Sequence, residues 1–257
     1  MKYYIVDAFA DGLFKGNPAG VCVLDNELDL LTMQNIAAEN NLSETAFVLK
    51  REGYYSLRWF TPKVEVDLCG HATLGSAFII ANFVDTGTKE ICFETKSGTL
   101  TVTKKDDLYI LDFPSRKPQK VNIVPQMEQA IASSVCEAYM SRHLLLLLEN
   151  EQQVQNLAPD FELIKQLSDH AVIVTAKGNT ADFVSRFFAP NVGINEDPVT
   201  GSAHTTLIPF WAERLCKEKM IAMQLSKRGG MVFCENCGNR VKMAGKAILY
   251  LQGEILI

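Results

Sequence analysis

Short apolar runs with alternating polar positions dominate the chain, and they predict more strands than helices. In the first half, strands are expected at 3–9, 20–24, 45–50, 54–60, 64–66, 91–95, 100–104 and 108–113. In the second half, strands are expected at 135–140, 144–148, 172–175, 183–188, 222–225, 231–234, 240–243 and 248–250. Period-two alternation between turn residues is typical of strands that bury one face.

Apolar residues recur at helical spacing in two longer stretches, one in each half of the chain. The first helix is expected from Gly70 to about Phe83, and the second from Ser202 to about Lys217. Shorter helices are expected at 31–40 and 161–167. Because strands outnumber helices and many neighbours are joined by short turns, the pattern predicts an α+β fold. Each half is expected to wrap a mostly antiparallel sheet around one central helix.

The best candidate for a linker is the polar, basic segment 114–120, which carries two prolines. It divides the chain into an N-terminal half, residues 1–116, and a C-terminal half, residues 117–257. The last strand could return to the first half. The order of elements repeats loosely, which indicates an approximate duplication with a period too long for a solenoid.

Two short segments, one at the start of each long helix, have the same design. Residues 67–73 read Asp-Leu-Cys-Gly-His-Ala-Thr, and residues 197–204 read Asp-Pro-Val-Thr-Gly-Ser-Ala-His. A glycine at a helix start allows a ligand to approach the backbone, and the exposed amides favour an anion there. The repeat therefore suggests a pseudo-symmetric cleft that holds a small carboxylate from both sides, and hence an enzyme.

Bulk composition excludes several other classes of protein. The 257 residues are 47% hydrophobic and 21% charged, which is typical of a soluble globular protein. A net charge of −5 argues against a nucleic-acid partner. No apolar run has membrane-spanning length, and an acid at Asp7 comes too early for a secretion signal. An odd number of cysteines, 7, favours reduced thiols and a cytoplasmic protein.

Glu44 and His71 are the first candidates for proton transfer. Glu44 lies between a helix end and a strand, among apolar neighbours, and partial desolvation would raise its pKa towards a useful range. A surface glutamate at a strand edge is the alternative. His71 follows a helix-start glycine, and the positive helix end is expected to lower its pKa and favour a neutral ring. A purely structural, capping histidine remains open for His71 and for His204.

Asp197 and Ser202 are the candidates in the second half. Pro198 keeps Asp197 out of the helix, so its carboxylate could point into the cleft or could cap the amides near Thr200 and Gly201. Ser202 could donate its hydroxyl, although serine at a helix start is by default a capping residue. A serine nucleophile is not indicated, because the Gly-x-Ser-x-Gly motif is missing.

The cysteines do not point to thiol or metal chemistry. Cys69 would be acidified at a helix start, but a racemase with two thiols needs a second cysteine where Pro198 or Val199 stands. Cys234 and Cys237 have the spacing of half a zinc motif, which a hairpin turn explains equally well. Neither nucleotide-binding glycine motif occurs, so we expect no cofactor and no metal.

Together these segments resemble the PhzF-like isomerases, a family named for an enzyme of phenazine biosynthesis. The matching stretches, which span nearly the whole chain, are residues 16–20, 42–45, 68–73 and 196–204, with further likeness at 228–230 and 253–254. The resemblance implies the diaminopimelate epimerase-like fold, in which two similar halves each curve an antiparallel sheet around a central helix. It also implies a site between the halves and, commonly, a homodimer.

The resemblance gives the candidate residues their roles. Glu44 matches the family's acid/base residue, which takes a proton from one substrate carbon and returns it to another. His71, Asp197 and Ser202 match the family's polar residues that surround the substrate and assist the proton shift. The substrate carboxylate would be bound by amides near Gly70, Ala72, Thr200, Gly201 and Ser202.

The expected function is a cofactor-independent isomerase acting on a small carboxylic acid. Two alternatives stay open: an epimerase that uses Glu44 with Asp197 or His71 as the opposite base, and a silent small-molecule binding protein. The segment 119–181 carries no family signature, so the phenazine precursor is not implied as substrate.

Overall fold

The computed structural model describes residues 1–168 and 171–257 and divides the chain into two compact units. Unit 1 comprises residues 1–112 and 244–257, and unit 2 comprises residues 113–243. The C-terminal segment thus belongs with the N-terminal one. The proposed division into halves at residues 116 and 117 stays a prediction.

Unit 1 is built from strands with helices between some of them. Its strands are β1 (Lys2–Ala8), β2 (Asn17–Leu24), β3 (Glu44–Lys50), β4 (Tyr55–Phe60), β5 (Glu65–Val66), β6 (Glu90–Thr95), β7 (Gly98–Lys105), β8 (Leu108–Pro114, which crosses into unit 2) and β17 (Ala247–Glu254). Its helices are α1 (Leu30–Asn40) and α2 (Gly70–Ile79), and a π-helical segment, Ile80–Val84, continues α2.

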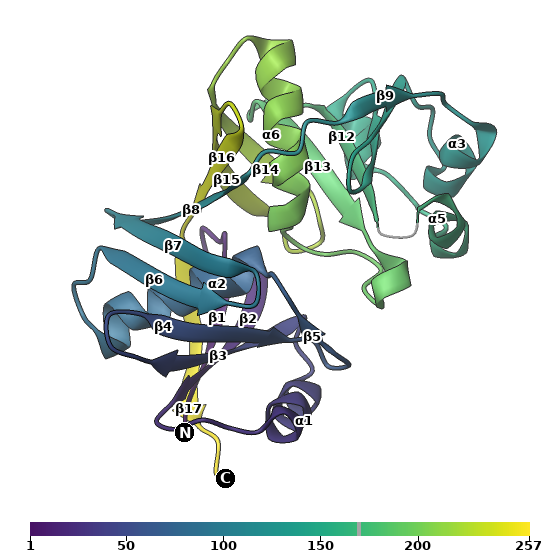
Figure 1. Cartoon of the computed structure of the whole chain (residues 1–257). Helices are drawn as coiled ribbons and strands as arrows, with labels where there is room; N and C mark the ends of the chain where they lie inside the picture. Colours follow the sequence, from purple (N-terminus) through teal and green to yellow (C-terminus); the bar gives the residue numbers. More distant parts are fainter. Residues whose placement is uncertain (169–170) are drawn as a thin grey trace. The chain divides into compact units, whose positions relative to one another are not determined.

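Strand β1 lies between β2 and β17 and is antiparallel to both. Strand β2 is parallel to β3, and helix α1 makes the connection between them, as a parallel pair requires. Helix α2 packs against β1, β2 and β3, and its place among the strands of this unit can be followed in Figure 1. Nearly all of its residues are buried, so α2 is the central helix of this unit.

Unit 2 repeats this architecture with different details. Its strands are β9 (Gln119–Val121), β10 (Glu137–Met140), β11 (Leu144–Leu147), β12 (Val172–Lys177), β13 (Phe183–Phe188), β14 (Lys219–Gln224), β15 (Gly230–Cys237) and β16 (Arg240–Gly245, which crosses into unit 1). Its helices are α3 (Pro125–Ile131), α4 (Glu151–Gln155), α5 (Phe161–Leu167) and α6 (Gly201–Leu215), with a 3-10 turn at Pro190–Val192.

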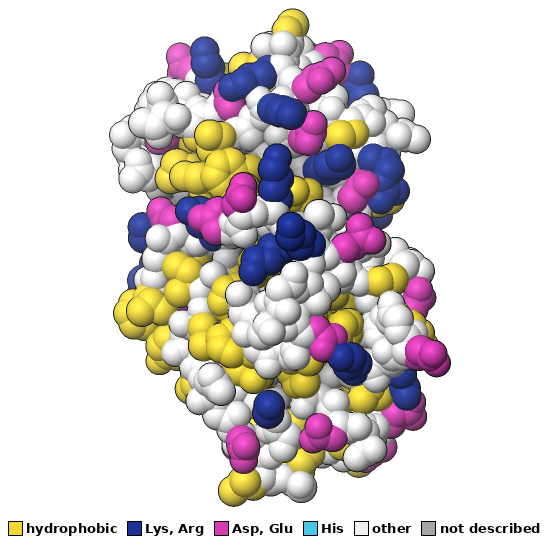
Figure 2. Space-filling model, turned by 90° about the vertical axis from the view of Figure 1, so that its left-hand side faces the viewer, with side chains coloured by type: hydrophobic (Ala, Val, Ile, Leu, Met, Phe, Trp, Pro, Cys, Tyr) yellow, Lys and Arg dark blue, Asp and Glu magenta, His cyan; other side chains and the backbone are white. Residues whose placement is uncertain are grey.

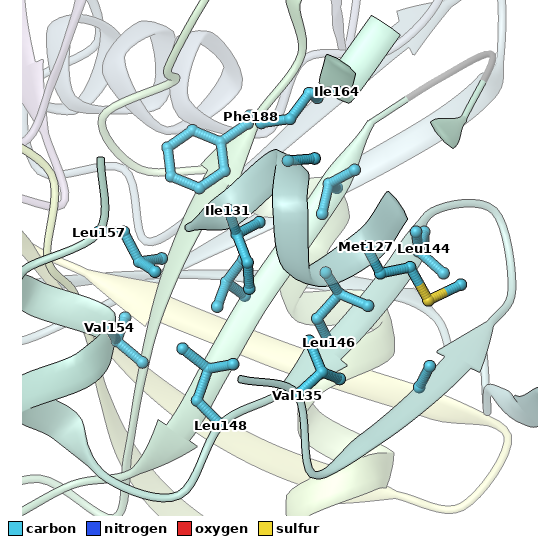
Figure 3. Close-up of a cluster of buried hydrophobic side chains, with 14 of the residues drawn as sticks. Met127, Ile131, Val135, Leu144, Leu146, Leu148, Val154, Leu157, Ile164 and Phe188 are labelled. Carbon is cyan, nitrogen blue, oxygen red and sulfur yellow. The ribbon is translucent and has the colours of Figure 1, made fainter. Parts of the chain in front are cut away.

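Helices again connect the parallel pairs of strands. Strands β11 and β12 are parallel and are joined through α4 and α5, whereas β13 and β14 are parallel and are joined through α6. A hydrophobic core fills the space under α3, α4 and α5, as Figure 3 shows. Helix α6 packs against β14 and β15 and is buried along most of its length.

The α+β fold predicted from the sequence is confirmed, including a long buried helix in each unit. Both helices start at the predicted glycines or within one residue of the expected start. Four elements were missed: β9 at the end of the expected linker, the short helices α3 and α4, and the 3-10 turn Pro190–Val192. Pro125 at the first turn of α3 was a usable start signal. Helix α4 has only five residues, too few for a periodic pattern.

Among the described residues, no helix is both long and apolar enough to span a bilayer. In the view of Figure 2, acidic and basic side chains are interspersed with hydrophobic patches.

Candidate active site

The first cluster of candidate residues, in unit 1, begins with the turn before β2. Gly16 has a φ of +65°, and an added Cβ would lie 2.2 Å from the carbonyl oxygen of Ala8, so only glycine fits there. The turn delivers Asn17, which is fully buried, to the start of β2. Sequence reasoning quoted Asn17 within a motif but gave it no role.

Glu44 is the first residue of β3, three residues after Asn41 ends α1 in the left-handed conformation. In the parallel pairing of β2 and β3, Glu44 lies opposite Ala19. Its side chain is 14% exposed, so the expectation of partial desolvation is met and the surface alternative is not.

His71 is the second residue of α2, and its side chain is 5% exposed. Its Nε2 lies 3.1 Å from Oε2 of Glu44, and its Nδ1 lies 3.1 Å from the carboxamide nitrogen of Asn17. Oε2 of Glu44 is buried and accepts no well-aligned hydrogen bond from the described residues. Burying a carboxylate oxygen without a well-aligned hydrogen bond costs folding free energy. The presence of such an oxygen in Glu44 therefore points to a functional use.

The expected lowering of the His71 pKa by the helix start is wrong. Burial alone lowers this pKa, but Cys69 and Glu44 raise it by more, and the net pKa lies well above its ordinary value. Near neutral pH we assign the increase to the Glu44 carboxylate, because burial raises the pKa of the Cys69 thiol and keeps it protonated. The Glu44–His71 pair therefore offers a carboxylate beside an imidazolium.

Among the described residues, one group has metal-binding donor atoms that all lie within 4.8 Å of one another. It consists of Glu44, Cys69 and His71. The sulfur lies 3.5 Å from Nδ1 and 3.9 Å from Nε2 of His71. A thiol must lose its proton to bind a metal, and burial raises the pKa of the Cys69 thiol, so we expect these three donors to hold no metal as they stand.

All seven cysteines are free thiols. Cys234 is buried and Cys237 is exposed at the end of β15, directly before Gly238, which has a φ of +76°. This is the turn geometry that the sequence offered as the alternative to a zinc motif.

The second cluster, in unit 2, surrounds the start of α6. Thr200 is the N-cap residue, but its hydroxyl donates to Oδ2 of Asp197 at 2.5 Å and caps no amide of α6. Cys69 at the start of α2 also provides no side-chain cap, whereas Asp29 and Asp160 cap α1 and α5. The two helix starts that were expected to bind anions thus lack the usual cap from their own N-cap residues.

The remaining predicted residues of this cluster lie at the same helix start. Gly201 and Ser202 form the first turn of α6, next to Thr200. Ser202 is half-buried, and in the described part of the chain its hydroxyl makes no hydrogen bond, so it is open to a ligand. Gly70 and Ala72 occupy the equivalent turn of α2. The prediction that both helix starts serve one substrate stays a prediction.

Gln224, which sequence reasoning missed, lies beneath this loop and is fully buried. Its Oε1 accepts from the backbone N–H of Thr200 at 2.9 Å, and its Nε2 donates to the backbone oxygen of Asp197 at 2.6 Å. A glutamine that ends a short strand has no recognisable motif, so no sequence signal distinguished it.

His204 is structural by its contacts. It is fully buried, its Nδ1 donates to the backbone oxygen of Thr200 at 2.8 Å, and its ring lies beside Phe183. Burial lowers its pKa to about 4. Because Nδ1 donates to a carbonyl oxygen, His204 caps no N–H group at the start of α6, and the capping role raised for this histidine stays a prediction.

We expect His204 to make the protein less stable in acid. Unfolded histidine binds a proton below about pH 6.5, whereas buried His204 does so only near pH 4, so stability is lost between these values, by about 3 kcal/mol in all. His204→Asn keeps a donor near the Thr200 oxygen and cannot titrate. Urea unfolding from pH 7 to pH 4 should therefore show a flatter slope for this variant. Equal slopes for both proteins would contradict the burial argument.

His71 contributes in a different pH window. Its raised pKa stabilises the folded protein below about pH 6.5, and this contribution is lost as the pH rises through the folded-state value. The two histidines can thus be separated in one series of unfolding curves.

Comparison with known proteins places this geometry in a family. The family model described as "Phenazine biosynthesis-like protein" matches residues 6–253. An uncharacterized isomerase of Pseudomonas aeruginosa is 48% identical over 255 residues, which are 99% of this chain and 98% of that protein. A crystal structure of a PhzF-family protein from Enterococcus faecalis is 50% identical and superimposes with a TM-score of 0.98, covering 100% of this chain and 99% of the other.

A more distant likeness concerns the fold alone. A probable proline racemase from Agrobacterium radiobacter is 10% identical and has a TM-score of 0.66, over 100% of this chain and 93% of that one. The epimerase-like architecture expected from the sequence is therefore present.

Proposed function

Since the chain belongs to the phenazine biosynthesis-like, or PhzF, family and is an isomerase, we propose that it shifts a proton within a small carboxylic acid, with Glu44 as the acid/base group. The observation that carries the proposal is the buried Oε2 of Glu44, which lies 3.1 Å from Nε2 of His71 and accepts no well-aligned hydrogen bond from the described residues. Proton transfer needs a group that can accept and return a proton in a site with little water.

The neighbours of Glu44 suit both halves of such a step. As Glu44 takes a proton from carbon, it becomes neutral, and the His71 imidazolium is left to balance the negative charge that develops on the substrate. When Glu44 gives the proton to a second carbon, its charge is restored and again paired with His71. An imidazolium donates from both ring nitrogens, so the carboxamide of Asn17, whose nitrogen lies 3.1 Å from Nδ1, must turn to present its oxygen to the ring. In that orientation Asn17 holds His71 from the other side of the ring during both steps.

The helix starts supply the proposed binding groups. The amides near Gly70 and Ala72 in α2 and near Gly201 and Ser202 in α6 point out of their helices at the positive end, where a carboxylate or an enolate-like charge is stabilised. Asp197, fixed by Thr200, would pair with a positively charged or hydroxyl group of the substrate. Catalysis then needs no cofactor.

The test is a screen of small carboxylic acids in D2O, in which each acid is scored for deuterium uptake and for a new isomer. Proton-shift catalysis predicts an isomeric product, with deuterium entering at the acceptor carbon to the extent that the proton carried by Glu44 exchanges with solvent. Tight binding of an acid without either change would instead favour the binding-protein alternative. Exchange with inversion at one carbon and without any new constitutional isomer would favour an epimerase.

We expect chelation of metals to leave the reaction rate unchanged. The Cys69 thiol stays protonated, so the three neighbouring donors do not form a ready metal site. The measurement compares isomer formation before and after extensive dialysis against EDTA. Loss of the rate on dialysis, with recovery on adding Zn²⁺, would overturn the metal-free mechanism.

A further inference from the structure

The loop that leads into α6, residues 197–200, is held from below by two side chains of one short segment. Gln224 ends β14, Ser226 follows two residues later in a bend, and both side chains bind the loop. Ser226 donates to the backbone oxygen of Pro198 at 2.9 Å. Gln224 binds the backbone of Asp197 before this proline and of Thr200 after it. The contacts cover Asp197, Pro198 and Thr200.

Gln224 is itself fixed in place. Its backbone lies between two strands, opposite Ser185 of β13 and Gly230 of β15. Its side chain has no exposed surface. A buried carboxamide is stable only when its donors and acceptor are satisfied, and here the loop satisfies both ends of the group.

A chain of two hydrogen bonds links Gln224 to Asp197 through the Thr200 hydroxyl, and in each bond the donor lies on the Gln224 side. Nε2 of Gln224 donates to Oγ1 of Thr200 at 3.2 Å, and the Thr200 hydroxyl donates to Oδ2 of Asp197 at 2.5 Å. A hydroxyl has one proton, and a carboxylate is only an acceptor. Because the amide N–H faces Oγ1, the hydroxyl proton is directed to the carboxylate.

His204 completes the fixation of Thr200 from the helix side. It donates to the Thr200 carbonyl, so two fully buried side chains hold the N–H, the C=O and the hydroxyl of this residue. The Thr200 side chain therefore has no freedom to turn and cap its own helix. This arrangement explains why the start of α6 lacks a cap from its N-cap residue.

We propose that Gln224 is a positioning residue that orients the Thr200 hydroxyl and, through it, the carboxylate of Asp197. The proposed function gives Asp197 its role with the substrate, and the inference rests on that function for its effect on catalysis. The orientation itself exists in the protein without substrate, so it can be tested separately.

The test uses Gln224→Met, which keeps the length of the side chain and removes every polar atom. Without the amide donor, the Thr200 hydroxyl is free to rotate, and Asp197 loses a hydrogen bond to its charged form. The apparent pKa of Asp197, followed by the ¹³C shift of its carboxyl carbon in ligand-free protein, should rise by about one pH unit. In the described part of the chain, the other charged or titratable groups near the loop include Glu196, which pairs with Arg186, and His204, together with Lys227 and Arg228, which follow Ser226.

Three further variants separate positioning from general damage. Gln34→Met is the matched control, because Gln34 in unit 1 also donates to a backbone oxygen, that of Thr61, and should leave Asp197 unchanged. Thr200→Val removes the hydroxyl and should reproduce the change of Gln224→Met even if that variant folds poorly. Thr200→Ser keeps the hydroxyl and should titrate like the wild type.

With a substrate in hand, Gln224→Met should lower kcat/KM roughly tenfold in the wild-type background and have little further effect in the Thr200→Val background. An unchanged Asp197 titration in both Gln224→Met and Thr200→Val would overturn the inference, whatever the catalytic result. Failure of the proposed function would appear differently, as a wild-type protein that isomerises no acid while its Asp197 titration still responds to Gln224.

Discussion

Glu44→Gln should reduce the rate of isomer formation by roughly 10³-fold, in the range that a general acid/base residue contributes. Glutamine has nearly the shape of glutamate and can stay in the same place at the start of β3, but it cannot accept the substrate proton. The measurement is kcat at saturating substrate, with deuterium uptake followed in parallel. Both should fall together, because both depend on removal of the proton from carbon.

The matched control is Glu52→Gln, which removes an exposed acid just beyond the end of β3. Its kcat and deuterium uptake should equal those of the wild type. Unfolding curves should show that Glu44→Gln keeps its fold. Wild-type turnover by Glu44→Gln would remove Glu44 from the mechanism.

Asp197→Asn should lower kcat/KM by roughly 10²-fold, the effect expected for a buried charge that pairs with the substrate. The new carboxamide oxygen can still accept from the Thr200 hydroxyl, so the loop should keep its shape while the charge is lost. The measurement is kcat/KM with the substrate that the screen identifies. An effect on a reaction that depends on Glu44 would show that residues from both units serve one substrate.

Asp160→Asn is the control in the same unit. Asp160 caps α5 through the amides of Glu162 and Leu163, and asparagine caps equally well, so no change in kcat/KM is expected. If Asp197→Asn turned over substrate at the wild-type rate, the alternative role of Asp197 would apply. Asp197 would then serve only to shape the turn or to cap the helix.

Most of the fold could be predicted because its elements have strong local signals. The two long helices are marked by glycine at their starts and by apolar periodicity, and the structure places them at Gly70 and Gly201. The parallel pairs, such as β2 with β3, could not be predicted, because strand pairing depends on contacts between residues distant in sequence. The return of β17 to pair with β1 is the same kind of contact, and local sequence patterns allow this pairing but do not predict it.

The candidate site was predictable where a motif carries the chemistry. Residues such as Glu44 and His71 lie in recognisable segments, and the structure brings them within 3.1 Å. The electrostatics of His71 could not be predicted, because a local argument from the helix start ignores a carboxylate that arrives from another strand. Asn17 and Gln224 were missed as partners for the same reason, since each acts on a residue far along the chain.

The central claim is that one group, Glu44, carries the proton from one carbon to another. We would label the donor carbon of the substrate with deuterium, run single turnovers in H2O, and locate the label in the product. The account predicts that a measurable fraction of the deuterium reappears at the acceptor carbon, and that this transfer is absent in Glu44→Gln. Complete loss of the label to water, with turnover persisting in Glu44→Gln, would contradict it.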